Sequence, residues 1–280
     1  MNHKQSVISN PGIGPTKDLN LRVSVAILVR VLFENPGNSE WMLALERKAT
    51  LHEAENGRVV EVKAQPFGGA VRILDLSAME TLAGHFHFDT ERSRSEQDFR
   101  LLIRPSAWET VREFCIEHFK QDADPIIETN PARELTEEFA DALKICLQRE
   151  QYSCRPVATV FENEAAPTEN INAKGLDTVR VYRIFEAIIS DSALAYQIMK
   201  NSESLSDRHL RELALVEAQN GGKGRANAML ALPLAALTDH YLSLSPEKRN
   251  APIFFEEYRL DETVSAILER IITPKYQRLL

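Results

Sequence analysis

Residues 131–147 have the sequence PARELTEEFADALKICL, and this stretch decides which fold the chain is expected to adopt. Apolar side chains recur along it every three or four positions, which is typical of a helix with one face buried. Pro131 suits the first turn of a helix, and Asn130 can cap the free N–H groups there. We therefore predict a helix over 131–147. The predicted buried stripe is Ala132, Leu135, Phe139, Ala142, Leu143 and Cys146.

The opposite side of this predicted helix is acidic. Glu134, Glu137 and Glu138 are spaced i, i+3 and i+4, so their carboxylates converge on one face. Clustered like charges repel each other, and a divalent cation such as Mg²⁺ relieves that repulsion while it also binds phosphate. Glu-rich helix surfaces are common and most of them are merely solvated, so these three residues alone favour the structural interpretation over a metal site.

Strands are predicted on both sides of the helix. Leu21–Glu34 is dense in β-branched residues, which indicates a buried strand. Residues 41–45 continue it as a hairpin, and residues 58–62 form a third strand. Residues 156–161 and 178–189 predict two further strands after the helix. This order of elements is typical of an α/β or α+β layered domain.

The other segments are less regular. Residues 1–19 are expected to form a loose leader, and residues 95–104 contain the strand-like sequence FRLLI. Residues 106–120 predict a helix with Ser106 as its N-cap. From residue 191 onward the pattern is mostly helical. The helices predicted there are 192–200, 207–219, 225–242 with a kink at Pro233, and 261–272.

Composition limits the possible functions. The 280-residue chain is 44% hydrophobic and carries a net charge of −8, without a basic stretch, so general nucleic-acid binding is not expected. Its apolar stretches are too short to span a bilayer, and no signal sequence is evident, so no membrane association is expected. Three cysteines without metal-ligand spacing indicate free thiols in a reducing compartment. We therefore expect a cytoplasmic protein.

Residues 133–138, Arg-Glu-Leu-Thr-Glu-Glu, resemble the second half of the Nudix box, whose pattern there is Arg-Glu-aliphatic-x-Glu-Glu. The sequence Gln-Pro-Phe-Gly-Gly at 65–69 follows the third predicted strand. It is similar to the Pro-Gly-Gly segment through which family members enter the box. Gly68 and Gly69 would let the backbone approach a metal or phosphate closely, although a glycine pair also forms simple tight turns.

The chain also departs from the family pattern. Gly69 and Arg133 are 64 positions apart, against about 14 in the family, which indicates an insertion at about 72–124. Pro125 stands where the family has its first Glu, and Ala140 and Asp141 replace a Gly and an aliphatic residue. The acids that are available to replace the first Glu are Asp122, Asp124 and Glu128.

The resemblance implies an α/β fold: a Nudix-like α/β/α sandwich with a mixed sheet over 20–190, a helical insertion and a helical C-terminal extension over 191–280. It also implies a Mg²⁺- or Mn²⁺-dependent hydrolase of a nucleoside diphosphate linked to another moiety. A homodimer is possible because many relatives pair. The alternatives are a Nudix-fold sensor or interaction protein that binds a nucleotide without cleaving it, and an unrelated α+β protein with a coincidental acidic helix.

Carried over by position, Glu137 and Glu138 would be the main metal ligands, and Glu134 would share the metal or act through water. The carbonyl of Gly68 or Gly69 would complete the metal shell beside the substrate. Arg133 would orient the carboxylates by ion pairing.

Three features outside this motif also bear ligand chemistry. Residues 220–225, Asn-Gly-Gly-Lys-Gly-Arg, precede a predicted helix, so Lys223 and Arg225 would suit a phosphate, although such loops are usually flexible connectors. His85 and His87 share a face of a strand without an evident third metal ligand. Glu186 interrupts an apolar strand, where it is either a base in a cleft or solvent-facing.

Overall fold

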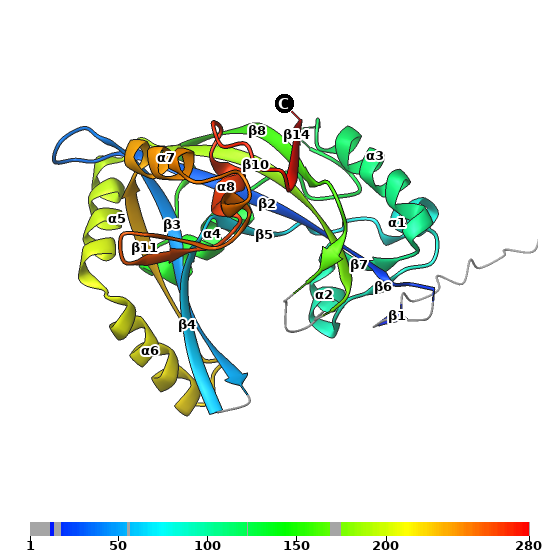
Figure 1. Cartoon of the computed structure of the whole chain (residues 1–280), viewed down its shortest axis with the longest axis horizontal. Helices are drawn as coiled ribbons and strands as arrows, with labels where there is room; N and C mark the ends of the chain where they lie inside the picture. Colours follow the sequence, from blue (N-terminus) through cyan, green and yellow to red (C-terminus); the bar gives the residue numbers. More distant parts are fainter. Residues whose placement is uncertain (1–11, 14–17, 55–56, 122, 169–174, 280) are drawn as a thin grey trace, which may run out of the picture.

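A computed structural model of the chain describes residues 12–13, 18–54, 57–121, 123–168 and 175–279. These residues form one mixed sheet of fourteen strands with eight α-helices around it, which confirms the predicted α/β class with a mixed sheet (Figure 1). The strands are β1 (Gly12–Ile13), β2 (Leu21–Glu34), β3 (Trp41–Ala54), β4 (Gly57–Gln65), β5 (Phe67–Ala70), β6 (His87–Phe88), β7 (Arg100–Ile103), β8 (Tyr152–Glu162), β9 (Ala166–Pro167), β10 (Asp177–Ile189), β11 (Arg225–Pro233), β12 (Ile253–Phe255), β13 (Tyr258–Leu260) and β14 (Tyr276–Leu279). The helices are α1 (Leu76–Ala83), α2 (Glu91–Glu96), α3 (Trp108–His118), α4 (Ala132–Leu143), α5 (Ser192–Ser204), α6 (Asp207–Gln219), α7 (Leu234–Ser243) and α8 (Val264–Ile267).

Strand β2 lies at the centre of the sheet. It pairs in parallel with β10 and antiparallel with β3, β5 and β7. Its side chains alternate between two hydrophobic cores, because successive residues of a strand point to opposite faces. Val25 and Ile27 belong to the first core, with buried residues of α4 and α5. Leu28 and Leu32 belong to the second core, with buried residues of α7 and α8, so helices cover both faces of the sheet.

The predictions for the first strands are confirmed. Strand β2 has the predicted bounds, and β3 and β4 are longer than the stretches predicted at 41–45 and 58–62. Strands β2 and β3 pair antiparallel as the predicted hairpin. Most of the predicted leader over 1–19 lies outside the described residues. Within it, Gly12–Ile13 form β1, which pairs with β6.

The segment at about 72–124, which was expected to be a helical insertion, is only partly helical, and this corrects the expectation. It contributes α1, α2 and α3 at one end of the molecule (Figure 1), but it also contains β6 and β7. Strand β7 pairs with the first residues of β2, so this segment extends the central sheet. The helix predicted over 106–120 begins at Trp108, because Pro105–Ala107 form a separate 3₁₀ turn. Ser106 therefore does not cap it.

The expectation of a helical C-terminal extension is also wrong in part. Helices α5 and α6 are present, but residues 225–242 form β11 followed by α7 instead of one kinked helix. Ala, Met and Leu favour helices in isolated peptides, yet β11 pairs with β3 along its whole length and is buried on both faces. Tertiary packing thus overrides local propensity there. Residues 261–272 contain only the short helix α8.

The last strands lie at the margins of the sheet. Strand β13 pairs with β4 at Leu260, and β14 pairs with β8. None of the helices in the described part of the chain has the length and apolar character needed to cross a bilayer.

Candidate functional site

Helix α4 begins at Ala132 and ends at Leu143, four residues earlier than predicted. The Asn130 side chain accepts a hydrogen bond from the Ala132 N–H at 2.8 Å, as expected of a residue that satisfies a free helix-start donor. Lys144 takes a left-handed conformation and ends the helix. Two members of the predicted stripe, Leu135 and Phe139, are almost fully buried in the first core, whereas Cys146 lies beyond the helix and is exposed.

The structure brings Gly69 and Glu134 together although they are far apart in the sequence. Strand β5 holds Gly69 opposite Ile27 of β2, and α4 packs over this strand through the Phe67–Phe139 ring pair at 5.3 Å. A methyl group at Gly69 would overlap the Glu134 carboxylate. Glycine at this position therefore lets an acidic side chain of α4 lie directly against the strand backbone.

Gly68 has a different role from its neighbour. Its φ of +142° disfavours any residue with a side chain, and a methyl group there would overlap the backbone carbonyl of Ile27. The backbone conformation thus requires glycine at position 68. At position 69 glycine is required because the Glu134 carboxylate lies so close.

Arg133 lies among several carboxylates. Its guanidinium donates to Glu128, with Nη2–Oε2 at 2.6 Å, and it also approaches Glu134 at 2.5 Å and Glu137 at 3.3 Å. Of the three acids considered as substitutes for the first Glu of the box, Glu128 is the one that pairs with Arg133. Asp124 instead bonds His118, and Asp122 lies outside the described residues.

Glu46 of β3 is a member of the site that the sequence prediction missed. Its side chain is fully buried and lies beside the Glu138 carboxyl of α4. It also accepts from Gln65 Nε2 at 2.9 Å, and Lys48 Nζ lies 3.4 Å away. A signal was present, because Glu46 follows Ala44 in the alternation of β3 and therefore points toward the first core, where a charged residue is unusual.

The acids of α4 divide into two residues that face inward and one exposed residue. Glu134 is buried, and Glu138 is half-buried with its Oε2 shielded from solvent and without a hydrogen-bond partner among the described residues. Glu137 is exposed and contacts Arg133 only at the edge of the cluster. Glu134 and Glu138 thus face inward with Glu46, and Glu137 lies at the surface.

Burial in this cluster disfavours negative charge. Burial raises the pKa of Glu134 to about 7, and the attraction of Arg133 opposes part of that rise. Burial and the adjoining Glu46 carboxyl raise the pKa of Glu138 to about 9. Such a group of carboxylates needs either a proton or a cation among them, which is the chemistry of a divalent-metal site.

No known family model matches this chain, and no characterised protein is significantly similar to it in sequence. In the described part of the chain, no group of three or more His, Cys, Asp or Glu side chains has the arrangement of a metal site. Glu46, Glu134 and Glu138 are therefore not arranged as metal ligands in this structure, and only the chemistry of their carboxylate oxygens fits a cation.

The glycine-rich loop at 220–225 lies elsewhere. Its backbone N–H groups at Lys223, Gly224 and Arg225 all donate to the carboxylate of Glu217, so the protein's own anion occupies the place expected for a phosphate. The loop leads into β11 and not into a helix. Its Gly224 bonds Leu51 of β3, five residues or roughly 17 Å along the strand from Glu46. The structure therefore does not bring Lys223 and Arg225 to the α4 cluster.

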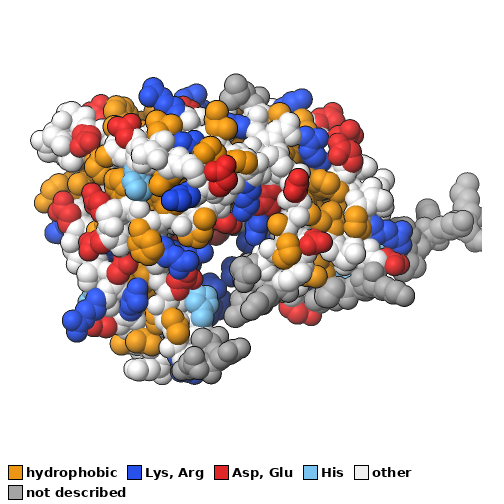
Figure 2. Space-filling model, in the orientation of Figure 1, with side chains coloured by type: hydrophobic (Ala, Val, Ile, Leu, Met, Phe, Trp, Pro, Cys, Tyr) orange, Lys and Arg blue, Asp and Glu red, His pale blue; other side chains and the backbone are white. Residues whose placement is uncertain are grey.

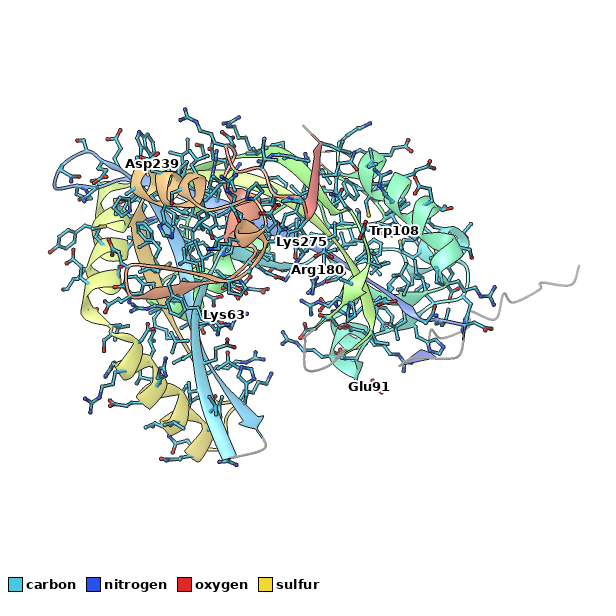
Figure 3. All side chains as sticks on the ribbon, viewed as in Figure 1. Lys63, Glu91, Trp108, Arg180, Asp239 and Lys275 are labelled. Atoms are coloured by element: carbon cyan, nitrogen blue, oxygen red, sulfur yellow. The ribbon has the colours of Figure 1, made fainter. Side chains whose placement is uncertain are left out.

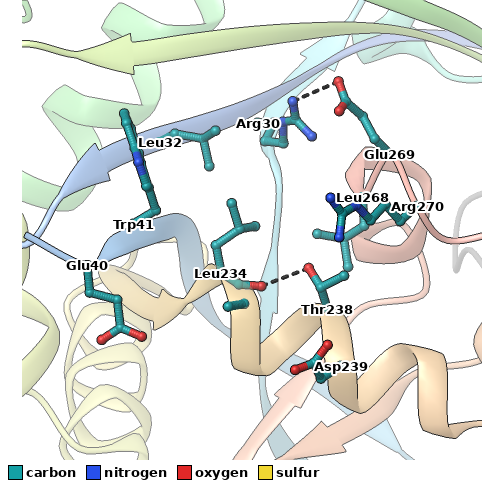
Figure 4. Close-up of a pocket in the computed structure, with 11 residues that line it drawn as sticks. Arg30, Leu32, Glu40, Trp41, Leu234, Thr238, Asp239, Leu268, Glu269 and Arg270 are labelled. Carbon is teal, nitrogen blue, oxygen red and sulfur yellow. Dashed lines mark hydrogen bonds and ion pairs between the residues drawn. The ribbon is translucent and has the colours of Figure 1, made fainter.

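The opposite face of the sheet carries a separate cavity of about 460 Å³ (Figure 4). Arg30 and Trp41 line it together with α7 and the segment after α8. Arg30 donates to Glu269 at 2.9 Å and also pairs with Glu186. Glu186 is thus neither a base in a cleft nor a solvent-facing residue, because it is buried in an ion pair.

The molecule is hollowed between its two halves (Figure 2). Lys63, Arg180 and Lys275 lie around this hollow (Figure 3), and each has a carboxylate partner. Lys63 pairs with Asp261 at 2.7 Å, and Arg180 pairs with Glu162 at 2.8 Å. These cations are therefore already neutralised within the fold.

Proposed function

We propose that the chain is a Mg²⁺- or Mn²⁺-dependent hydrolase that cleaves a nucleoside diphosphate linked to another moiety, on a Nudix-like α/β/α sandwich. The observation that carries this proposal is the contact between Glu134 and Gly69, beside the buried pair of Glu138 and Glu46. The proposal is also supported by the helices on both faces of the sheet, with α4 against the strand that holds the glycine pair.

In this proposal the cation is held by oxygens of Glu134, Glu138 and Glu46, with the carbonyl of Gly69 nearby. Glu137 stands at the rim, where water can separate it from the ion. When bound, the cation would supply neutralisation of the diphosphate and activation of a water molecule.

Neighbouring side chains hold the acidic groups of the proposed site in position and balance part of their charge. Arg133 fixes the direction of the Glu134 carboxylate, and Glu128 holds Arg133 in place through its two-point hydrogen bond. Gln65 donates to Glu46 and so keeps that carboxylate facing α4. These contacts arrange the acidic groups before any ligand arrives, which reduces the cost of ordering them.

The direct test is product release from dinucleoside polyphosphates, nucleotide sugars, NAD and ADP-ribose in the presence of Mg²⁺ or Mn²⁺. We expect Glu138→Gln and Glu46→Gln each to lower kcat at least 100-fold, since both remove a metal-binding oxygen while keeping the shape. Glu212→Gln on α6 is the matched control, because Glu212 is exposed and pairs only with surface residues. Full activity of Glu138→Gln on the substrate that the wild type cleaves would contradict the proposal.

The alternative is a Nudix-fold protein that binds a nucleotide without cleaving it. It is favoured by the contacts within the cluster, because Arg133 already pairs with the Glu134 carboxylate and burial favours a protonated Glu138. The replacement of the glycine that ends the family motif by Ala140 points the same way. Calorimetry with ADP-ribose and NAD separates the two functions, since the alternative expects saturable binding and no product.

A further inference from the structure

The cavity of about 460 Å³ on the face of the sheet opposite α4 is large enough for a small molecule, because such sites usually measure roughly 300–1,000 Å³. One end of it is apolar, where the lining comes from Trp41 of β3, Leu32 of β2 and Leu234 of α7 (Figure 4). Met42 pairs with Pro233, so the exposed Trp41 lies next to the start of α7. This end of the cavity therefore suits an aromatic or aliphatic group.

The other end of the cavity is polar and carries charges of both signs. Asp239 lies five residues after Leu234 on α7, which places it roughly 7.5 Å further along the helix axis. Arg270 reaches the cavity from the segment after α8 (Figure 4). Both side chains are exposed and line the same space, yet they form no ion pair with each other, and neither is bonded to another residue in the described part of the chain. Two opposite charges therefore face one cavity without neutralising each other.

The other charged residues of the lining already have partners. Arg30 pairs with both Glu186 and Glu269, and Glu40 accepts a hydrogen bond within the exposed turn between β2 and β3. The last strand of the described chain, β14, is separated from β2 by β8 and β10. That separation amounts to three strand spacings, or roughly 14 Å, so β14 is not part of this wall. The lining thus leaves one carboxylate and one guanidinium without a counter-charge among the described residues.

We propose that this cavity binds a free α-amino acid with an apolar side chain. The ammonium and the carboxylate of such a molecule supply the counter-charges of Asp239 and Arg270, and a carboxylate matches the paired N–H donors of a guanidinium. The apolar side chain of the ligand lies toward Trp41, at the other end of the cavity. A ligand with one charge satisfies only one of the two protein groups. The site is independent of the proposed hydrolase centre, because it lies on the opposite face of the sheet from α4.

Titration calorimetry at pH 7 with EDTA tests this site with four small molecules: L-phenylalanine, L-leucine, phenethylamine and 3-phenylpropionate. Phenethylamine has the ring and the ammonium of phenylalanine without the carboxylate, and 3-phenylpropionate has the ring and the carboxylate without the ammonium. We expect saturable binding of an amino acid, with a Kd at least about tenfold lower than that of either singly charged analogue. The tighter of the two amino acids shows whether the apolar end prefers an aromatic or an aliphatic group.

Substitutions at the polar end should separate the two charges. Arg270→Gln should weaken amino-acid binding at least about tenfold and leave the affinity for phenethylamine unchanged. Asp239→Asn should weaken amino-acid binding by a similar factor and leave the affinity for 3-phenylpropionate unchanged. Arg208→Gln and Glu212→Gln are the matched controls, because each removes one charge from the exposed face of α6 and should leave every affinity unchanged.

The proposal is overturned if neither amino acid binds saturably. It is also overturned if an analogue with a single charge binds as tightly as phenylalanine, because the second charge then contributes nothing. Phenethylamine as the tightest ligand would show an amine site, and 3-phenylpropionate as the tightest would show a carboxylate site. Amino-acid affinity that is unchanged in both Arg270→Gln and Asp239→Asn would place the ligand elsewhere on the protein and would equally contradict the proposal.

Discussion

Two glutamates on opposite sides of the sheet, the buried Glu186 and the half-buried Glu138, are in opposite electrostatic states. Glu186 of β10 lies in the sheet register opposite Arg30 on one neighbouring strand and Arg155 on the other, and it is hydrogen-bonded to both. Burial works against its charge, but the bonds from the two arginines outweigh burial and lower the pKa of Glu186. Glu138 faces Glu46, and burial together with that neighbour raises its pKa to about 9.

The difference separates a carboxylate whose charge is balanced within the fold from one whose charge is not. Around Glu186 the fold itself supplies the compensating cations, so the group is complete without a ligand. Around Glu138 the fold gathers carboxylates, and the attraction of Lys48 does not offset burial and the neighbouring Glu46, so a proton or an added cation is favoured there. A buried acid whose neighbours do not balance it therefore indicates a site more strongly than a buried acid alone.

The largest effect on stability is expected from removing the Glu186 carboxylate, whose charge is balanced by arginines within the fold. Glu186→Gln leaves the buried Arg30 with only the half-exposed Glu269 as a partner, so we expect the free energy of unfolding to fall by about 3 kcal/mol. Urea denaturation at pH 7 measures it. Glu212→Gln, on the surface of α6, should change the same quantity by less than about 0.5 kcal/mol. A Glu186→Gln variant as stable as the wild type would mean that this ion pair is not a structural element.

The next effect is the stabilisation expected when Mn²⁺ binds to the carboxylate cluster of Glu46, Glu134 and Glu138. Mn²⁺ at one hundred times its Kd should raise the free energy of unfolding of the wild type by about 2.7 kcal/mol, because it binds only the folded state. Glu134→Gln and Glu46→Gln should abolish this increment, and Glu212→Gln should retain it. An equal increment in all of these variants would show that Mn²⁺ binds elsewhere on the protein.

The third effect is smaller and opposite in sign to that of Glu186→Gln. With EDTA at pH 7, Glu138→Gln should raise the free energy of unfolding by about 1–2 kcal/mol. The pKa of Glu138 is raised on folding, so the stability that this group contributes is present below its ordinary pKa and is lost as pH rises toward 9. Glutamine has no such loss, so the variant should also show a flatter dependence of stability on pH between 5 and 9.

The matched control for this variant is Glu137→Gln. Glu137 is on the same helix but exposed, and its replacement should shift stability by less than about 0.5 kcal/mol. A destabilised Glu138→Gln would mean that its carboxylate is compensated within the fold after all, and the contrast with Glu186 would disappear.

The sequence predicted the parts of the fold that depend on local pattern. Strand β2 and helix α6 have the predicted bounds, because alternation in one and helical spacing in the other agree with their tertiary contacts. At 225–233 the local preference was helical, and pairing with β3 decided otherwise. The same limit applies to the site: the acids of α4 follow from their spacing, but Glu46 joins them only because α4 packs on β5 and β11, and β11 pairs with β3.

The ion pair of Glu186 could not be predicted for the same reason. Its partners, Arg30 and Arg155, lie 156 and 31 positions away and meet it only through strand register. A residue that interrupts an apolar strand can equally be a base, a surface residue or a buried ion pair, and the register decides among them. The sequence also left open which acid holds Arg133, until the turn before α4 placed Glu128 beside it.

The smallest effect on stability is expected at Gly69. Its substitution tests a single contact of the carboxylate cluster, the one between Gly69 and Glu134. Gly69→Ala puts a methyl group against the Glu134 carboxylate, whose flexible end can move aside, so the free energy of unfolding should change by less than about 1 kcal/mol. The Mn²⁺ increment should nevertheless fall, because the displaced carboxylate no longer lies against the strand. Gly37→Ala, in an exposed turn without such a neighbour, is the matched control and should retain the full increment. If Gly69→Ala binds Mn²⁺ as the wild type does, the ion does not depend on the contact between the glycine and Glu134, and the proposed metal site would have to exclude Glu134.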